Sequence, residues 1–343
     1  MTDANDIVFS PIDIAELTEG YLSERRAACE TGGLASGLSS YIHGLDAHGE
    51  NDSGFLPVLD GDVVSIIARP GNGKTSFMMR WARERTNEIR RRAAIGDADA
   101  ARSVVVYCTW EQTVEALHSF HVASSNADLG LTVTKMARGR ITDAQWRGIQ
   151  ESNVRRISDP LWFIGHSTKR KSKRPVIDVD ALARALWEIE NWQGTDNKFR
   201  VDCVFVDYLQ RIPYGRAESK TIGISDNLDR LKNAALALGS KIIVGVQAGR
   251  DVDKRDLPIP GMDDGQWTSN IEQASDVVIT LVRPIKYKEE GESFDGVPVS
   301  GYKQMLVTVA KQKMGESNFA QWVDFDPRYN SLDTPIVKNI KMD

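Results

Sequence analysis

Hydrophobic residues in this chain form short continuous runs, separated by longer stretches in which they recur at helical spacing. From Phe55 onward, seven runs are apolar on both faces and rich in β-branched residues. They are DVVSIIA at 62–68, SVVVYCTW at 103–110, LWFIG at 161–165, VDCVFVDYL at 201–209, KIIVGVQ at 241–247, DVVITLV at 276–282 and QMLVTVAKQK at 304–313. Runs of this kind, alternating with helices, predict an α/β fold whose mainly parallel sheet is flanked by helices on both faces.

The C-terminal part of the pattern predicts a different strand arrangement. The segments YKQMLVTVAKQK, 302–313, and FAQWVDFD, 319–326, are separated by a short Gly-containing turn. Two apolar strands joined in this way are typical of an antiparallel pair. We therefore expect a C-terminal β-hairpin at the end of the sheet.

The N-terminal part predicts a short helical extension. Ser10 and Pro11 form a common start signal, and apolar residues then recur at helical spacing, which predicts one amphipathic helix over 10–30. Such a helix cannot bury its own apolar stripe, so it should dock on the main domain or on a neighbouring subunit. We expect a linker-type helix and connector over 1–54 and one main domain over 55–343.

The composition is that of a globular protein, with 41% hydrophobic and 27% charged residues. The formal net charge is −5, so any binding to nucleic acid must come from local patches. Cys29, Cys108 and Cys203 are far apart and show no metal-ligand spacing, and the chain begins without a secretory signal or a membrane-spanning stretch. These features favour a cytoplasmic protein that has no membrane partner.

The stretch SIIARPGNGKTS, 65–76, is an apolar strand, a glycine-containing turn and the start of a helix. This is the context of a phosphate-binding loop, in which backbone amides surround phosphate oxygens at a helix N-terminus. The residues expected to bind the nucleotide are Arg69, Pro70, Gly71, Asn72, Gly73, Lys74, Thr75 and Ser76. Lys74 would reach the β- and γ-phosphates of ATP, and the Thr75 hydroxyl would ligate Mg²⁺. The usual pattern has glycine where this chain has Ala68, a position that needs only a small residue if its backbone angles are ordinary.

Two carboxylates follow apolar strands. Asp207 ends VDCVFVD, and at the carboxyl edge of a parallel sheet it would hold Mg²⁺ through water. Glu111 follows SVVVYCTW, where it would polarise the water that attacks the γ-phosphate. Glu111 equally suits the first turn of a helix, so these residues alone leave both interpretations open.

Six motifs in this order resemble those of DnaB-type replicative DNA helicases. They are ARPGNGKTS at 68–76, RGRITDAQW at 138–146, VFVDYLQRI at 204–212, VGVQAGR at 244–250, SNIEQASDVVITLVR at 269–283 and VTVAKQKMG at 307–315. The first is similar to the family's Walker A loop, the third to its Walker B strand and the fourth to its sensor strand. The resemblance implies a RecA-like P-loop NTPase core that assembles into a ring, expected to be a hexamer, with ATP bound between subunits.

The same resemblance assigns roles to further residues. It implies that Glu111 is the catalytic glutamate, that Gln247 senses the γ-phosphate, and that Lys311 and Lys313 reach a neighbour's nucleotide. The family's second finger is typically arginine, and Lys313 lacks the planar fork of a guanidinium, so we expect a weaker clamp. We expect no counterpart of the family's primase-interacting N-terminal domain, only a helix comparable to its linker, whose packing on the adjacent protomer would hold the ring together.

Two loops are candidates for contact with single-stranded DNA, RIPYGRAESKTIG at 211–223 and the longer segment at 249–270. Cationic side chains can track the phosphates, and an aromatic ring can stack on a base. The candidate residues are Arg216, Lys220, Arg250, Gln266 and Trp267. Family members usually carry arginine where Gln266 stands, and Trp267 is equally compatible with a place in the core.

These observations lead to two hypotheses of function. The first is a ring-forming, Mg²⁺- and ATP-dependent DNA helicase or translocase that acts on single-stranded DNA in replication, with loader or primase proteins as partners. The alternative keeps the ATPase ring but not the unwinding, and makes it a loader, a recombination factor or a nucleotide-gated scaffold. The acidic balance and Gln266 favour the alternative, whereas the six motifs favour the helicase.

Overall fold

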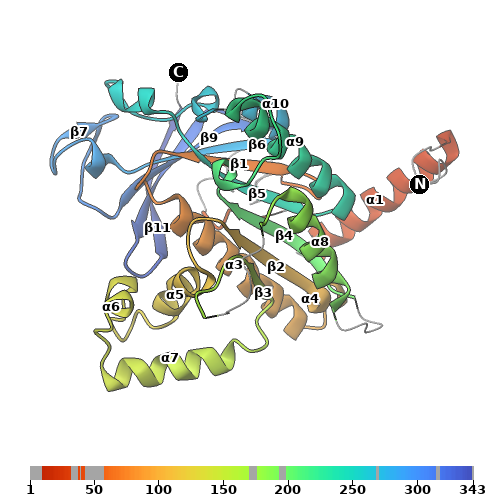
Figure 1. Ribbon diagram of the computed structural model, residues 1–343, viewed down its shortest axis with the longest axis horizontal. Coiled ribbons are helices and arrows are strands. Elements are labelled where there is room, and N and C mark those ends of the chain that lie inside the picture. The colour runs from red at the N-terminus through yellow and green to blue at the C-terminus, as the bar shows by residue number, and fades with distance from the viewer. Residues whose placement is uncertain are drawn as a thin grey trace.

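The computed structural model describes residues 10–31, 38, 40–42, 58–169, 176–192, 198–267, 270–313 and 317–341. Within this part, nine strands form one sheet in the order β11-β10-β9-β6-β1-β5-β4-β2-β3 (Figure 1). The parallel strands are β1 (Val63–Ala68), β2 (Ser103–Thr109), β3 (Leu161–Ile164), β4 (Arg200–Asp207), β5 (Lys241–Gln247) and β6 (Val277–Val282). The mainly parallel sheet predicted from the apolar runs is therefore confirmed.

The antiparallel strands continue the sheet beyond β6. They are β9 (Gln304–Gln312), β10 (Phe319–Asp326) and β11 (Ser331–Lys341). The pairing of β9 with β10 confirms the predicted hairpin. Strand β11 was not predicted, because its sequence SLDTPIVKNIK has no continuous apolar run and contains a proline. A separate two-stranded ribbon pairs β7 (Ser293–Phe294) with β8 (Val297–Pro298).

Helices connect the strands and cover both faces of the sheet (Figure 1). They are α3 (Lys74–Ala94), α4 (Ala98–Arg102), α5 (Val114–Ser125), α6 (Val133–Ala137), α7 (Asp143–Arg155), α8 (Val179–Glu190), α9 (Lys220–Leu238) and α10 (Ile271–Ala274). Short 3₁₀ turns are η4 (Leu209–Arg211), η5 (Arg250–Lys254), η6 (Met262–Asp264) and η7 (Pro284–Lys286). No helix in the described part of the chain is long and apolar enough to cross a membrane.

Two hydrophobic cores lie on opposite faces of the sheet. On one face, Trp81 of α3 packs against Phe205, whose ring is stacked on that of Tyr107 with centroids 5.8 Å apart. On the other face, α8 and α9 contribute Leu186 and Leu228 to a second core. Because successive strand residues point to opposite faces, strands buried on both faces read as continuous apolar runs in the sequence.

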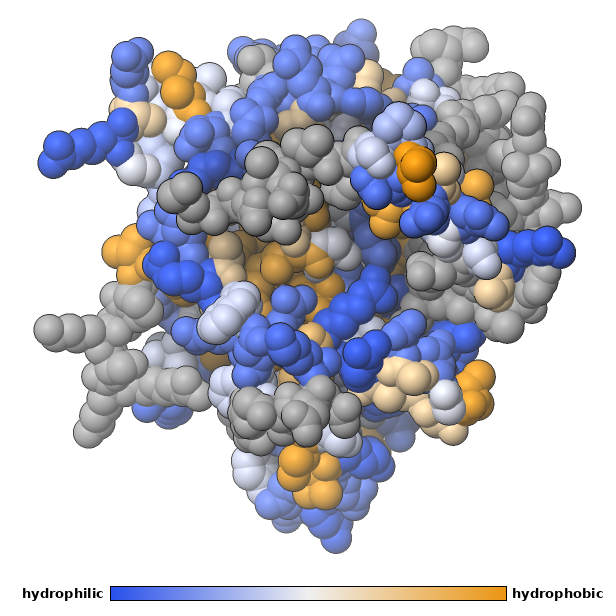
Figure 2. All heavy atoms as spheres, turned by 90° about the vertical axis from the view of Figure 1, so that its right-hand side faces the viewer, coloured by the Kyte–Doolittle hydropathy of each residue, from blue (hydrophilic) through white to orange (hydrophobic). Residues whose placement is uncertain are grey.

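The predicted N-terminal helix is present as α1 (Pro11–Thr31), and it projects from the body of the molecule (Figure 1). Its first turn is capped by Ser10, whose hydroxyl accepts a hydrogen bond of 3.2 Å from the amide of Asp13. Apolar side chains along α1 remain exposed, for example Ile12 at 71% and Leu22 at 57%. Figure 2 views the molecule from the side toward which α1 projects and shows hydrophobic residues among mostly hydrophilic ones. The described residues thus leave the apolar stripe of α1 without cover.

Candidate nucleotide-binding site

The P-loop lies between the end of β1 and the start of α3, as the sequence predicts. Gly71 and Gly73 have positive φ angles of 76° and 90°, which glycine adopts at little cost. A Cβ atom at Gly73 would lie 2.9 Å from Cε of Met305, so the end of that flexible side chain would have to shift to make room for it. Ala68 is the last residue of β1 and pairs in regular register with Gln247. The position that usually holds glycine is therefore ordinary strand, and alanine fits it.

A pocket of about 310 Å³ opens around this loop. It brings together residues that are far apart in the sequence, including the predicted Glu111 and Gln247. Its lining from the loop is Ala68, Arg69, Pro70, Gly71, Gly73, Lys74, Thr75 and Ser76. The other lining residues are Glu111, Gln112, Phe120, Tyr208, Gln247, Arg283 and Pro327. The strand ends β1, β2, β4 and β5 thus converge on one edge of the sheet, where parallel α/β folds bind ligands.

Asn72 belongs to the loop but its side chain does not line the pocket. It is 1% exposed, its Oδ1 accepts from the amide of Arg283 at 2.8 Å, and its Nδ2 lies 3.1 Å from the hydroxyl of Tyr287. The Arg69 guanidinium is likewise held in place, because it donates to Asp253 at 2.6 and 2.9 Å. These contacts fix the shape of the loop from outside and leave its backbone for the ligand.

Lys74 lies between an acidic and an aromatic side chain. Its Nζ is 3.8 Å from Oδ1 of Asp207 and 3.8 Å from the ring centroid of Tyr208. Burial lowers the pKa of Lys74 to about 8, although the nearby carboxylates of Asp207 and Glu111 act in the opposite direction. The phosphates of a nucleotide would supply the negative charge that this buried ammonium lacks.

Asp207 offers one free carboxylate oxygen toward this site. Its Oδ2 accepts from the Tyr107 hydroxyl at 3.1 Å, and burial together with Asp207 raises the pKa of Tyr107 well above its ordinary value, so that phenol stays protonated. Its Oδ1 is buried and has no hydrogen-bond partner among the described residues. Carboxylate and hydroxyl oxygens are the ligands that Mg²⁺ prefers alongside substrate phosphates. Asp207 and the pocket-lining Thr75 therefore fit a Mg²⁺ ion bound with a nucleotide.

Gln210, a residue that the sequence analysis did not single out, connects Gln247 to the second candidate DNA loop. The Oε1 of Gln210 accepts from the amide of Gln247 at 3.0 Å, and its Nε2 donates to the carbonyl oxygen of Gln266 at 3.1 Å. The amide of Gln266 also donates to the carbonyl of Gln247 at 2.8 Å. The end of β5 and the loop at Gln266 are thus hydrogen-bonded to each other both directly and through Gln210.

The two predicted fingers lie at the opposite edge of the sheet from the P-loop. Lys311 donates to the backbone carbonyl of Ser275 at 2.9 Å, and Lys313 pairs with Asp62 at 3.4 Å and with Asp276 at 3.6 Å. Both lysines therefore lie beside the first residues of β1 and β6, whereas the P-loop follows the last residue of β1. Since β1 is six residues long, about 20 Å separates these edges. Neither lysine can reach the P-loop of its own chain.

The two candidate DNA loops meet each other on the P-loop side of the sheet. The Nζ of Lys220, at the start of α9, lies 3.3 Å from the ring centroid of Trp267 in the second loop. Trp267 is 42% exposed, which decides against a place in the core. Arg216 and Arg250 are also exposed. The Oε1 of Gln266 is buried and lacks a hydrogen-bond partner within the described residues.

Comparison with known proteins gives the family. Residues 37–333 match the family described as DnaB-like helicase C terminal domain. The chain belongs to this family. It is 25% identical over 322 residues to a probable plasmid replicative DNA helicase of Chlamydia muridarum (strain MoPn / Nigg), covering 94% of this chain and 60% of that protein. It is 23% identical over 274 residues to the replicative DNA helicase DnaB of Helicobacter pylori (strain ATCC 700392 / 26695), covering 79% of this chain and 48% of that protein.

Solved structures confirm the fold of the DnaB-like C terminal domain. One of them, described as an ATPase domain, superposes with a TM-score of 0.72 at 21% identity, covering 95% of this chain and 99% of that one. A DnaB-like replicative helicase, described with its interactions with primase, gives a TM-score of 0.67 at 20% identity, covering 87% of this chain and 63% of that one. The chain spans about 60% of the length of the Chlamydia muridarum relative. The RecA-like architecture is thus established for this DnaB-like chain.

Several pocket residues of this DnaB-like domain had no clear signal in the sequence. Phe120 lines the pocket but is a single aromatic residue in an otherwise ordinary helix, Tyr208 follows the candidate Asp207, and Pro327 enters from the turn after β10. Arg283 follows the apolar run of β6, and its amide meets Asn72 from 211 residues away. Only Arg283 and Tyr208 stood inside motifs of the family resemblance, where they could have been singled out.

Proposed function

We propose that this chain is the ATP-hydrolysing part of a ring-forming replicative DNA helicase that moves along single-stranded DNA. The observation that carries the proposal is the separation of two half-sites. One pocket brings together Lys74, Glu111 and Gln247 at the carboxyl ends of the parallel strands. Lys311 and Lys313 lie at the opposite ends of these strands. A complete site then requires two copies of the chain.

In the proposed hydrolysis, the P-loop amides and Lys74 bind the β- and γ-phosphates of ATP, with Arg69, Pro70, Gly71 and Ser76 forming the rest of the cradle. When bound, Mg²⁺ would neutralise charge on these phosphates, and Thr75 and Asp207 would hold it. The Glu111 carboxylate accepts a hydrogen bond from the attacking water and orients it. Gln247 donates to the γ-phosphate and responds when that group leaves.

At the subunit interface, Lys311 and Lys313 of one copy would stabilise charge on the phosphoryl group bound by the next copy. The ring is expected to be a hexamer. The exposed apolar side chains of α1 would dock on an adjacent subunit, so that 1–54 serves as linker and 55–343 as the motor. Closed rings with identical interfaces bury such a stripe on every subunit.

DNA contact is assigned to the loops after β4 and β5, which lie on the P-loop side. Arg216, Lys220 and Arg250 would neutralise phosphates, and Trp267 would stack on a base once Lys220 releases its ring. Gln266 contributes a polar contact where family members usually carry arginine. The Gln210 bridge between Gln247 and Gln266 links nucleotide state to this loop. Primase and loader proteins are the proposed partners.

The test is ATP hydrolysis with and without single-stranded DNA at low salt, together with unwinding of a forked duplex. We expect DNA to raise the hydrolysis rate and the fork to be opened in the presence of ATP and Mg²⁺. Hydrolysis that is stimulated by DNA without unwinding would favour a loader or recombination factor. Hydrolysis that ignores DNA would contradict the proposal and favour a nucleotide-gated scaffold.

A further inference from the structure

A second polar pocket, of about 380 Å³, lies between α3, α5 and α7. Four arginines line it, and they come from two of these helices and the residue after α7. The arginines are Arg83, Arg90, Arg155 and Arg156. Its other lining residues include His121, Ser124, Ser125, Glu84 and Asp159. Such a convergence of guanidinium groups stands out in a chain whose formal net charge is −5.

The two carboxylates that line the pocket form ion pairs with two of its four arginines. Glu84 pairs with Arg83 at 2.9 Å, and Asp159 pairs with Arg90 at 2.7 Å. These are the two carboxylates among the lining residues of this pocket. Burial of His121 lowers its pKa, so the imidazole adds no charge at neutral pH. The excess positive charge is therefore that of Arg155 and Arg156.

The interior of the pocket also holds polar atoms without partners. The Nη2 of Arg156 donates to the carbonyl of His121 at 3.1 Å and to Oγ of Ser125 at 2.5 Å. Its Nη1, and Nδ1 of His121, are buried and have no hydrogen-bond partner within the described part of the chain. Burial lowers the pKa of Arg156 to about 10, with Arg155 and Arg83 acting in the same direction and Asp159 opposing them. A buried guanidinium with a free donor is costly unless an acceptor arrives.

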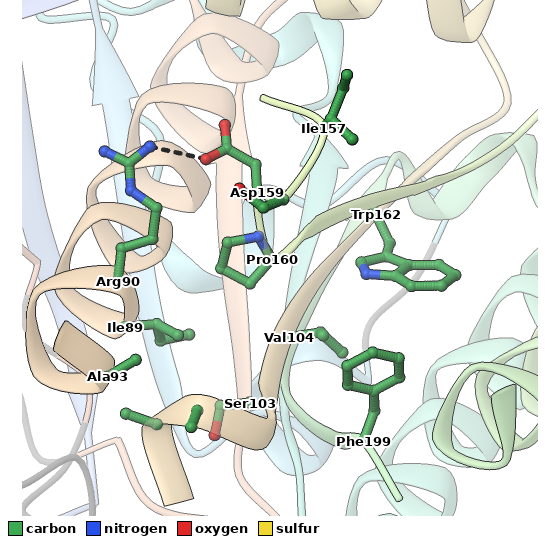
Figure 3. Close-up of a pocket in the computed structure, with 13 residues that line it drawn as sticks. Ile89, Arg90, Ala93, Ser103, Val104, Ile157, Asp159, Pro160, Trp162 and Phe199 are labelled. Atoms are coloured by element: carbon green, nitrogen blue, oxygen red, sulfur yellow. Dashed lines mark hydrogen bonds and ion pairs between the residues drawn. The ribbon is translucent and has the colours of Figure 1, made fainter. Parts of the chain in front are cut away.

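The wall of the pocket on its other side is the Arg90–Asp159 ion pair. Figure 3 shows this pair from a neighbouring apolar pocket of about 240 Å³, which is lined on its far side by Trp162 and Phe199. Arg90 and Asp159 line both pockets. The ion pair thus lies between the apolar pocket and the arginine pocket.

The donor set favours a phosphoryl group over a carboxylate. Two arginines and two serine hydroxyls, Ser124 and Ser125, face one space, and a phosphate presents more acceptor oxygens than a carboxylate, in a geometry that guanidinium groups bind bidentately. The volume lies within the range of small-molecule sites. Arg83 follows Lys74 by nine residues on α3, a rise of about 14 Å, and this pocket shares no lining residue with the pocket around the P-loop.

We propose that the pocket between α3, α5 and α7 binds the phosphoryl group of a small ligand, through Arg155 and Arg156, at a site separate from the P-loop. This goes beyond the proposed motor function, because the hydrolysis mechanism proposed above uses none of these arginines. Arg155 is exposed at the rim of the pocket, where it would contact the phosphoryl group first. Arg156 lies deeper, and its Nη1 would donate a hydrogen bond to the same group.

The experiment measures pyrophosphate binding by calorimetry in the full chain carrying Lys74→Ala, which weakens phosphate binding at the P-loop. In this background we compare Arg155→Gln, Arg156→Gln and the control Arg147→Gln. Arg147 is an exposed arginine of the same helix that does not line the pocket. We expect Kd to rise about tenfold or more in the first two variants and to stay within twofold in the control.

Arg155→Gln keeps the test decisive even if Arg156→Gln disturbs folding, because Arg155 is exposed. Absence of pyrophosphate binding in the Lys74→Ala protein, or equal binding in all three variants, would overturn the proposal. Parallel titrations with inorganic phosphate, ADP and a short single-stranded oligonucleotide identify the source of the phosphoryl group by which of them the Arg155→Gln change weakens. Since no titration requires hydrolysis or unwinding, failure here is distinguishable from failure of the motor function.

Discussion

The Nζ atom of Lys74 lies 3.8 Å from Oδ1 of Asp207, a distance at which the two charges attract but do not share a good hydrogen bond. Oδ1 has no other partner within the described residues, and the ammonium is buried enough for its pKa to fall to about 8. The phosphates of a nucleotide would therefore stabilise the Lys74 ammonium, and a divalent cation would stabilise the Asp207 carboxylate. Preorganised charge of this kind costs stability in the fold and is recovered on binding.

The first prediction is that Lys74→Met stabilises the protein in nucleotide-free buffer. The folded pKa of about 8 lies below the ordinary value of 10.5, so the unfolded chain binds the proton more tightly. The lysine therefore costs up to about 3 kcal/mol at pH 7, and this cost fades as pH rises from about 8 to 10. Urea denaturation of both proteins from pH 7 to 10 checks it. A stability difference that does not shrink with rising pH would contradict the assignment.

The second prediction concerns Glu111 as the group that orients water. Glu111→Gln should lower kcat for ATP hydrolysis by about 10²- to 10⁴-fold, because the amide no longer accepts the proton of the attacking water. The affinity for nucleotide should stay within threefold, since Glu111 is not needed to hold phosphates. The matched control is Glu115→Gln, an exposed carboxylate at the start of α5 that is not among the pocket-lining residues. Equal loss in both variants would point to a structural effect.

The third prediction tests whether the fingers act between subunits. Lys74→Ala has an inactive P-loop and intact fingers, whereas Lys313→Ala has an intact P-loop and a disabled finger. Each protein alone should be inactive, but rings assembled from an equimolar mixture should regain hydrolysis at interfaces that pair an intact P-loop with an intact finger. Mixtures of Lys74→Ala with Glu111→Gln should stay inactive, because both lesions affect the same side of the interface. No recovery in the first mixture would argue that Lys313 does not act on the nucleotide of a neighbouring subunit.

Features that depend on neighbours in the chain could be located from the sequence. The P-loop, Asp207 at the end of β4 and the parallel sheet all follow from local runs of residues. Contacts between distant segments were not accessible in this way. The hydrogen bond between Asn72 and Tyr287 joins residues 215 positions apart. The hydrogen bond from Gln210 to Gln266 depends on how two loops pack together.

The arginine pocket illustrates the same limit. Arginines at 83, 90, 155 and 156 lie in two polar helical stretches, where each is compatible with an ordinary solvated face. Only the packing of α5 between α3 and α7 brings the guanidinium groups to one cavity. Similarly, β11 pairs with β10, but its sequence holds no long apolar run that would predict a strand.

The fourth prediction concerns the buried ion pair of Arg85 and Asp202. Arg85 is 0% exposed and donates to both oxygens of Asp202, at 2.7 and 2.8 Å. Removing one partner, as in Asp202→Ala, leaves a buried charge and should cost about 3–5 kcal/mol of unfolding free energy. The double variant Arg85→Met/Asp202→Leu should cost clearly less than the sum of its single changes. Additive losses in urea denaturation at pH 7 would mean that the two groups do not depend on each other.

The same ion pair determines whether the protein gains or loses stability as the pH falls. Burial opposes ionisation, but Arg85 and Lys241 hold the pKa of Asp202 well below its ordinary value. The stability that this carboxylate contributes is therefore complete above about pH 4 and lost as pH falls below that value. Wild type should lose stability on acidification more steeply than the Arg85→Met/Asp202→Leu double variant. Parallel acid profiles of the two proteins would contradict this origin.

The last prediction concerns the contact between Lys220 and Trp267. If Trp267 stacks on a base, Trp267→Ala should weaken binding of single-stranded DNA by about 1–3 kcal/mol with little change in salt dependence. Lys220→Ala removes one phosphate contact and should lower the slope of log K against log salt by about 0.7. Because the two side chains touch, with Nζ 3.3 Å from the ring centroid, the ring is freed in Lys220→Ala and its stacking is retained. Fluorescence anisotropy of a labelled oligonucleotide at several salt concentrations measures both quantities. If Trp267→Ala changed the salt slope and Lys220→Ala did not, the two roles assigned here would be reversed or absent.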